Sequence, residues 1–548
     1  MKKNRKKNGT PAEITEKGET TQEMEAIMDA ASDDTAEIEL LLDNNAPTDE
    51  PEAPKAPDED GIDDVPDAFE QAAPADEAAA VDPMTQTSDP DADANTQPVD
   101  NTAEDTTVPD DGEDDDELQP TEPAPDEELP EDNSVSSSPE ASLSDGAEYK
   151  KLGLYLHIPF CKSKCAYCDF YSSDKIVCSG RKIPEEMKLY CTALKNNMRI
   201  ISERTTQYNV DTVFIGGGTP TALPPKLLLD IVKEVENDFY LDDDCEFTVE
   251  MNPATADARL LKKLRRAGVN RLSIGLQSAH NHELAALSRI HTTGDFTECF
   301  QMAREAGFDN INIDVMFGIP EQTKQTFMET LEFVVSMKPE HISMYNLRIE
   351  DGTPFGEKKH MLPLPDEDTE CAMYFDGIAY LASQGYHQYE ISNFARDGYE
   401  RRHNMRYWLG EEYIGCGPAA HSYFGGRRFS LRRSLAQYCK LLETKGTSLP
   451  SSLLDESYVI DRREEVAEYL MLRLRLCSGI DTEDFRARFG ADFDEIFGRK
   501  LAVYIKHGLM THENGHYAFT PQGMFVSNQI LSNIIPFETK YEKSGKTS

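Results

Sequence analysis

Six apolar segments, each followed by a stretch with the apolar spacing of an amphipathic helix, dominate the sequence after residue 149. The predicted strands are Leu152–Ile158, Asp211–Ile215, Glu246–Glu250, Arg271–Leu276, Asn310–Met316 and His341–Leu347. The predicted helices include Lys226–Val235, Ala258–Arg266, Phe296–Glu305 and Thr326–Met337. Strands that alternate with helices form a parallel α/β sheet. We therefore expect a parallel sheet of six strand–helix units over residues 149–385, either open or curled into a partial barrel.

The sequence changes character after residue 385. Residues 386–460 are rich in glycine, tyrosine, arginine and histidine, and we predict that they connect two domains. The helical pattern then returns, with predicted helices at Glu464–Leu476, Asp481–Phe489, Arg499–Lys506 and Gly523–Ile535 and a strand-like segment at Gly508–Thr520. Helices combined with a short hairpin predict a winged-helix-like α+β module over residues 461–540, a shape that does not by itself imply DNA binding.

The N-terminal part of the chain is strongly acidic. The first 150 residues hold 46 of the 101 acidic residues and 8 of the 55 basic ones, so they carry most of the net charge of −46. This segment has few aromatic residues and cannot bury enough apolar surface to offset its chain entropy. We predict a disordered acidic extension over residues 1–148. Such a charge argues against nucleic acid as a partner.

Targeting and redox signals point to the cytoplasm. The basic start of the chain is not followed by an apolar stretch, and no run is long enough to cross a bilayer, so we expect neither secretion nor an integral membrane protein. Eleven cysteines, an odd number, fit a reducing compartment better than a disulfide framework.

Three cysteines follow the first predicted strand, at Cys161, Cys165 and Cys168. The spacing C-x-x-x-C-x-x-C allows three thiolates to hold three irons of a four-iron cluster, which leaves the fourth iron open to a non-protein ligand. Zinc is the alternative metal for thiolates on a short loop. It usually takes a fourth protein ligand nearby, and no partner C-x-x-C pair follows. We therefore predict an iron–sulfur cluster.

Glycine and polar residues collect at the carboxyl ends of the predicted strands, where parallel α/β folds carry their active sites. The second strand ends in the run Gly216–Pro220, and glycine allows a ligand to approach the backbone closely. Glu250, Gln277, Arg289 and Asp314 lie at or just past strand ends. Each alone is an ordinary turn, cap or surface residue. Together beside the cysteine loop they indicate a site for a ligand with amine, carboxylate and hydroxyl groups.

These motifs resemble the radical S-adenosylmethionine superfamily, in the branch that contains oxygen-independent coproporphyrinogen III oxidase. The resemblance covers residues 150–540 and includes the run His157–Phe160 before the cysteines. It implies a partial (β/α)6 barrel in which Cys161, Cys165 and Cys168 bind a [4Fe–4S] cluster and the open iron binds S-adenosylmethionine. The residues that the resemblance assigns to the S-adenosylmethionine pocket are Tyr155, Tyr167, Gly217, Gly218, Thr219, Glu250, Gln277, Arg289 and Asp314.

One position separates this chain from the decarboxylating oxidases. Those enzymes carry another cysteine two residues after the triplet, where this chain has Phe170. The ending Cys168-Asp169-Phe170 resembles instead the HemW group of heme chaperones. That group also carries an H-N-x-x-Y-W motif, which is present here from His403 to Trp408. The segments Tyr389–Phe394 and Gly415–Tyr423 resemble the same group.

The resemblance implies heme as a third cofactor, and we assign its binding to the motif residues His403, Asn404, Tyr407 and Trp408. A neutral imidazole is a good heme-iron ligand, and aromatic side chains cover porphyrin faces. A histidine among aromatic residues is also a common hydrogen-bonded core residue, so this alternative stays open. His421 and His157 are rival ligands, although His157 is better explained by packing against the cysteine loop.

Three functional hypotheses follow. The favoured one is a heme chaperone that passes heme to an acceptor protein and does not turn over as a coproporphyrinogen oxidase. The second is radical oxidative decarboxylation by a coproporphyrinogen III oxidase, against which Phe170 stands. The third is an interaction protein with a vestigial cluster. The sequence identifies no acceptor and leaves the oligomeric state open, with a homodimer as one alternative.

Overall fold

The six predicted strands form the centre of a twelve-stranded sheet. The computed structural model describes residues 149–180 and 182–535, which belong to one unit of the chain; the predicted acidic extension lies outside the described residues. The central strands are β1 (Lys150–Ile158), β2 (Tyr208–Gly217), β3 (Leu241–Met251), β4 (Arg271–Gln277), β5 (Ile311–Phe317) and β6 (His341–Asn346). They pair in chain order and are all parallel. The predicted α/β fold is confirmed.

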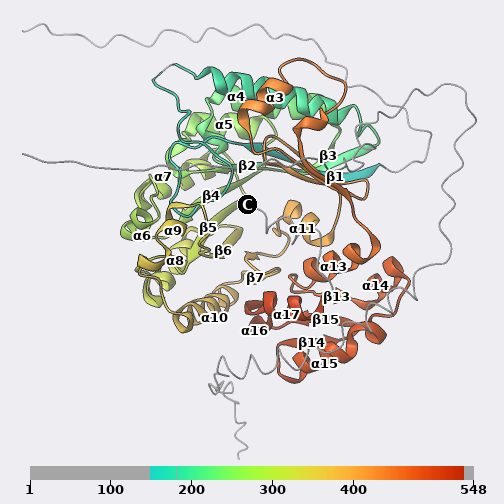
Figure 1. The fold of residues 1–548 in the computed structure, drawn as a ribbon. Coiled ribbons are helices and arrows are strands. Elements are labelled where there is room, and N and C mark those ends of the chain that lie inside the picture. The colour runs from blue at the N-terminus through green and yellow to red at the C-terminus, as the bar shows by residue number, and fades with distance from the viewer. Residues whose placement is uncertain (1–148, 181, 536–548) are drawn as a thin grey trace, which may run out of the picture. The chain divides into compact units, whose positions relative to one another are not determined.

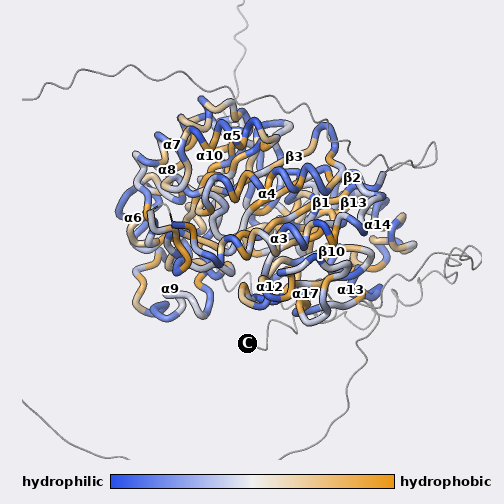
Figure 2. The backbone as a smooth tube through the Cα atoms, turned by 90° about the horizontal axis from the view of Figure 1, so that it is seen from above, coloured by the Kyte–Doolittle hydropathy of each residue, from blue (hydrophilic) through white to orange (hydrophobic). Residues whose placement is uncertain are grey.

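Helices follow the central strands and lie along the outer side of the curved sheet (Figure 1). They are α3 (Glu185–Ser202), α4 (Pro225–Asp238), α5 (Ala258–Arg266), α6 (Asn281–Ala286), α7 (Thr293–Glu305) and α8 (Lys324–Met337), with α9 (Pro354–Glu357) and α10 (Glu367–Ser383) after β6. Hydrophilic and hydrophobic residues alternate along α3 and α4 (Figure 2), as expected of helices that cover a sheet on one side only.

The two faces of the sheet differ in chemistry. On β1 the side chains of Leu152, Leu154, Leu156 and Ile158 are fully buried in the apolar core. The opposite face of the sheet, inside the barrel, carries polar side chains on five of the six central strands. These include Thr212, Glu246, Arg271, Asn312 and His341. A buried polar face needs hydrogen-bonding partners, and these come from a later part of the chain.

Residues 386–460 extend the central sheet at both edges, which the sequence did not predict. At one edge β8 (Asn393–Ala395) pairs with β6 and with β7 (His387–Gln388). At the other, β9 (Tyr413–Cys416) runs parallel to β1 and is followed by β10 (His421–Phe424), β11 (Arg427–Leu431) and β12 (Leu454–Val459), with α12 (Leu435–Leu441) before β12. Between the two edges, α11 (Arg402–Leu409) lies on the inner side of the sheet (Figure 1).

The C-terminal module has its own core and a small sheet. Its helices are α13 (Arg462–Arg473), α14 (Thr482–Phe489), α15 (Arg499–Lys506), α16 (Pro521–Phe525) and α17 (Ser527–Ile534). Its strands are β13 (Ile480–Asp481), β14 (Met510–Glu513) and β15 (His516–Phe519), in the order β13-β15-β14. The single last helix predicted at Gly523–Ile535 is wrong in detail, because the chain forms two helices that meet at Val526.

Candidate functional site

The three cysteines lie on the loop that follows β1. Backbone hydrogen bonds hold this loop on two sides: Cys161 N–H donates to Ser173 O at 3.0 Å, and Ala166 N–H donates to Leu287 O at 3.2 Å. The end of β2 is tied to the start of the loop, since Thr219 N–H donates to Phe160 O at 2.8 Å. The loop is therefore positioned by β1, β2 and the segment after α6.

All three thiols are free, and Cys161 is buried. The Thr219 hydroxyl lies 3.6 Å from Cys161 Sγ, and Arg289 Nη1 donates to Cys165 Sγ at 3.4 Å. Burial raises the pKa of Cys161 and raises the pKa of Cys168 to about 11, so binding a metal has to displace these protons. Among the described residues, no three or more His, Cys, Asp or Glu side chains are arranged to hold a metal ion in this conformation, and this includes the three cysteines of the loop.

A cavity of about 620 Å³ opens beside the cysteine loop at the carboxyl ends of the strands. It brings together five of the predicted site residues, namely Tyr167, Cys168, Glu250, Gln277 and Asp314. The other predicted residues of the cysteine loop and the S-adenosylmethionine pocket do not line this cavity. Arg289 supports the loop through Cys165 and also donates to Gly275 O at 2.8 Å, and Gly217 N–H donates to Glu250 Oε2 at 3.2 Å.

The glycines after β2 are explained by close packing. Gly217 has φ +107°, and a Cβ at this position would lie 2.7 Å from the His157 ring. A Cβ on Gly218 would lie 2.7 Å from the carbonyl oxygen of Phe160. Both glycines therefore allow β2 to approach the cysteine loop, in addition to any contact with a ligand.

Two half-buried carboxylates, Glu250 and Asp314, line the cavity. Burial, followed by repulsion from Asp314, raises the pKa of Glu250 to about 7, and burial raises the pKa of Asp314. The buried Arg401 lines the same cavity and faces both carboxylates. Sequence reasoning missed Arg401, whose only signal was its place immediately before the helix that carries the H-N-x-x-Y-W motif.

His403 is inside the barrel and fully buried. Its Nδ1 is hydrogen-bonded to the Thr212 hydroxyl at 2.9 Å, and its Nε2 to the Tyr407 hydroxyl at 2.7 Å. The ring stacks on Phe214 with a centroid distance of 5.4 Å. Burial lowers the pKa of His403 to about 3, so the ring is neutral. Both nitrogens are occupied in this conformation, and the ring can reach an iron only after one of these bonds breaks.

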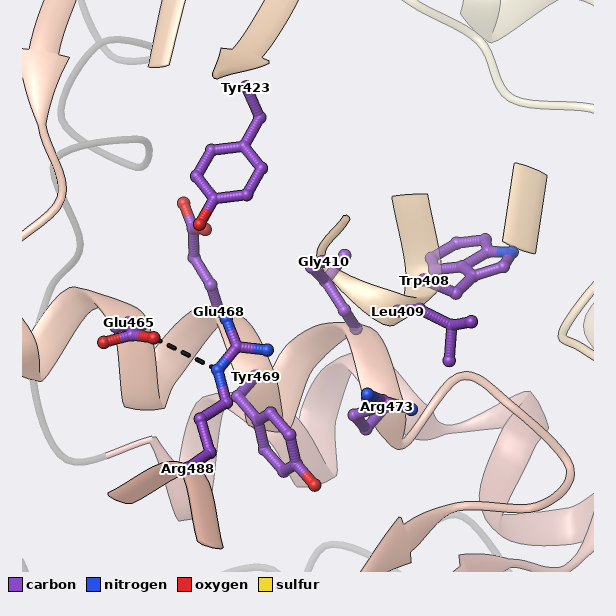
Figure 3. Close-up of a pocket in the computed structure, with 10 residues that line it drawn as sticks. Trp408, Leu409, Gly410, Tyr423, Glu465, Glu468, Tyr469, Arg473 and Arg488 are labelled. Atoms are coloured by element: carbon purple, nitrogen blue, oxygen red, sulfur yellow. Dashed lines mark hydrogen bonds and ion pairs between the residues drawn. The ribbon is translucent and has the colours of Figure 1, made fainter. Parts of the chain in front are cut away.

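Trp408 lies apart from His403 and Tyr407. It lines a space of about 20 Å³ between α11 and α13, together with Tyr423, Tyr469 and Arg488 (Figure 3). Among the described residues, the buried Nε1 of Trp408 has no hydrogen-bond partner. Asn404 is half-buried on α11. The structure therefore does not gather the four predicted heme residues around one cavity, and the space beside Trp408 has room for about one water.

The rival histidines differ from each other. His157 Nδ1 is hydrogen-bonded to the Tyr155 hydroxyl at 2.9 Å, and its Nε2 to Tyr171 O at 2.8 Å. Its environment therefore agrees with packing against the cysteine loop. His421 is exposed at the start of β10.

Comparison with known proteins agrees with this geometry. The model of the Radical SAM superfamily matches residues 155–334, and that of the HemN C-terminal domain matches residues 460–526. Heme chaperone HemW of Bacillus subtilis is 35% identical over 382 residues, which cover 69% of this chain and 97% of that relative. Heme chaperone HemW of Escherichia coli is 32% identical over 385 residues, with 69% and 97% covered.

The chain belongs to the HemW heme chaperone family. The fold of this HemW-family chain is also that of Escherichia coli coproporphyrinogen III oxidase (HemN), described as a radical SAM enzyme. The two structures match with a TM-score of 0.60 and 23% identity over 71% of this chain and 90% of the other. The family resemblance expected from the cysteine loop and the Cys168-Asp169-Phe170 ending is confirmed. No helix in the described ranges is long and apolar enough to span a membrane.

Proposed function

We propose that this HemW-family protein binds heme and passes it to an acceptor protein, on a scaffold that carries a [4Fe–4S] cluster and S-adenosylmethionine. The observation that carries the proposal is the match to HemW heme chaperones along 97% of their length. The acceptor is a protein still to be identified.

The residues of the cysteine loop fit such a cluster. Three free thiols on one loop, two of them with hydrogen-bond donors directed at the sulfur, are suited to thiolate ligands of iron. In this proposal Cys161, Cys165 and Cys168 would hold the cluster, and S-adenosylmethionine would bind to it. The reduced cluster together with S-adenosylmethionine would supply radical chemistry. The chain contributes the pocket: Tyr167, Glu250, Gln277 and Asp314 bind and orient the cofactor at the cavity wall.

Phe170 favours the chaperone over the oxidase. It lines the cavity beside the cysteine loop and is 63% exposed, so an apolar ring stands where the resemblance places a thiol in the decarboxylating oxidases. A phenyl ring can neither donate nor accept a proton at that position. The oxidase alternative therefore lacks a group that the family pattern requires.

The contacts of His403 suit reversible heme binding. If His403 is the iron ligand, the hydrogen bond between its Nε2 and the Tyr407 hydroxyl breaks when heme binds and forms again when heme is released. The internal hydrogen bond weakens net affinity, and a carrier needs binding that is weak enough for release. Asn404, Tyr407 and Trp408 are the other residues that we propose for heme binding.

We also propose a cytoplasmic location and a three-part organisation. All eleven cysteines lie in the described residues and are free, which fits a reducing compartment. The proposed parts are the barrel over residues 149–385, the region 386–460 with the H-N-x-x-Y-W motif, and the C-terminal module over residues 461–540. A homodimer is the oligomeric state to test first.

The test is a parallel anaerobic titration of reconstituted protein with heme and with coproporphyrinogen III. We expect a saturable heme spectrum and no decarboxylated product. A variant with Cys161, Cys165 and Cys168 all replaced by Ala serves as the cluster-free control. Steady formation of decarboxylated product by the wild-type protein would support the oxidase instead, and absence of saturable heme binding would contradict the chaperone.

A further inference from the structure

Arg401 is a buried cation that lines the cavity. Its residue is 4% exposed, and it lines the cavity that also contains Glu250 and Asp314. It follows β6 at a long distance in the sequence and lies immediately before α11. None of the motifs that define the cluster loop includes it.

The guanidinium is held by the barrel on several sides. Nη2 donates to the Ser273 hydroxyl at 3.0 Å, and the group lies 5.0 Å from the centroid of the Phe214 ring. Ser273 in turn lies 3.5 Å from Asp314 Oδ2. Within the described residues Nε has no hydrogen-bond partner. Contacts with β4 and β2 thus place the guanidinium of Arg401, and its Nε is buried.

The positive charge of Arg401 lowers the pKa values of Glu250 and Asp314, the two carboxylates of the cavity. Burial raises the pKa of both Glu250 and Asp314, and attraction to Arg401 opposes that rise in each case. The other titratable or charged groups near Arg401 come from β4, β6, α11 and the segment after β7. These groups are Arg271, His341, Tyr345, Tyr389, Glu390 and His403. Among these neighbours Arg271 is a second cation and Glu390 is a carboxylate. Asp314 also faces Arg289, whose attraction opposes the rise in the pKa of Asp314.

We propose that Arg401 is a positioning residue for the S-adenosylmethionine pocket, which holds Asp314 through Ser273 and favours the ionised forms of Glu250 and Asp314, so that both carboxylates accept hydrogen bonds from the donors of the cofactor. This inference rests on the proposed function, because it assumes that the cavity takes that cofactor. A carboxylate is an acceptor only when it is ionised, whereas its protonated form also presents a donor. Without Arg401, Glu250 loses an attraction that opposes the rise in its pKa and retains a proton at neutral pH, whereas Asp314 still faces the cation of Arg289.

The test measures S-adenosylmethionine affinity by calorimetry on anaerobic, reconstituted protein between about pH 6 and about pH 9. We expect Arg401→Gln to move the midpoint of the affinity profile upward by about one pH unit, which lowers affinity roughly fivefold at pH 7 and restores it at alkaline pH. Arg401→Lys keeps the charge and retains the wild-type midpoint. Arg402→Gln is the matched control, since Arg402 begins the same helix but is 41% exposed and pairs with Asp244 at 3.2 Å.

The outcomes separate this inference from the proposed function. If Arg401→Gln weakens binding by the same factor at every pH, or leaves it unchanged, the positioning role is wrong although the cofactor assignment stands. If Arg401→Lys shows the midpoint of Arg401→Gln, charge is not the property that matters, and the inference is again wrong. If the wild-type protein takes up no S-adenosylmethionine, the cofactor assignment itself fails.

Discussion

Tyr407→Phe is expected to strengthen heme binding if His403 is the iron ligand. The Tyr407 hydroxyl is 2.7 Å from His403 Nε2, so in the heme-free protein it occupies the nitrogen that would bind iron. Removing the hydroxyl leaves Nε2 buried without this partner and raises the free energy of the heme-free state. The heme-bound state has already given up that bond and is not affected in the same way.

The size of the effect follows from the kind of bond. A hydrogen bond between neutral groups contributes about 0.5–1.5 kcal/mol to stability, and that range corresponds to about two- to thirteenfold in affinity. The bond from Thr212 to Nδ1 at 2.9 Å remains and continues to orient the ring. The gain in heme affinity is accompanied by a loss of similar size in the free energy of unfolding of the heme-free protein.

The assay is an anaerobic titration followed at the heme absorption band, with denaturant unfolding of the same preparations. Tyr413→Phe is the control, because the Tyr413 ring packs 4.5 Å from that of Tyr407, while its hydroxyl contacts Arg428 rather than His403. This control should bind heme as the wild type does. Unchanged or weaker heme binding by Tyr407→Phe, with unchanged binding by His403→Ala, would refute the assignment of His403 and leave it a core residue.

Three further variants test individual contacts that stabilise the barrel and the C-terminal module. Gly217→Ala should abolish S-adenosylmethionine binding and destabilise the protein by about 1–3 kcal/mol in denaturant unfolding, because φ is +107° and the new Cβ meets the His157 ring. Glu246→Gln should lower the free energy of unfolding by about 1–2 kcal/mol. The Glu246 carboxylate accepts hydrogen bonds from the backbone N–H groups of Arg402 and His403, at the start of α11, at 3.0 and 3.1 Å. Gly479→Ala should make the C-terminal module sensitive to limited proteolysis, because its Cβ would collide with the backbone of Tyr517. Wild-type stability or protease resistance in any of these variants would contradict the corresponding contact.

The fold was predictable where local pattern and tertiary structure agree. The predicted bounds of α5 and α15 are those observed, because their apolar spacing is regular and each is covered by its own core. The strands β7 to β12 escaped prediction, because most are two to five residues long and depend on pairing with distant partners. The region that contains them was expected to connect two domains, and instead it completes the central sheet.

Part of the candidate site could likewise be predicted from the sequence, and part could not. The cysteine loop and the residues at strand ends could be found from spacing and from the rule that parallel strands end at one rim. The environment of His403 could not, because Thr212 lies 191 residues earlier in the chain and only the return of α11 into the barrel brings the two together. The place of Arg401 in the cavity could not be predicted for the same reason, because it depends on the path of the chain between β8 and α11.

The most direct test of the whole account is anaerobic reconstitution of the cluster, followed by electron paramagnetic resonance of the reduced protein with and without S-adenosylmethionine. We predict about four irons and four sulfides per chain, a cluster signal that changes when S-adenosylmethionine is added, and no signal in the variant that lacks Cys161, Cys165 and Cys168. A wild-type protein that takes up no iron and sulfide, or whose signal is the same with and without S-adenosylmethionine, would contradict the account.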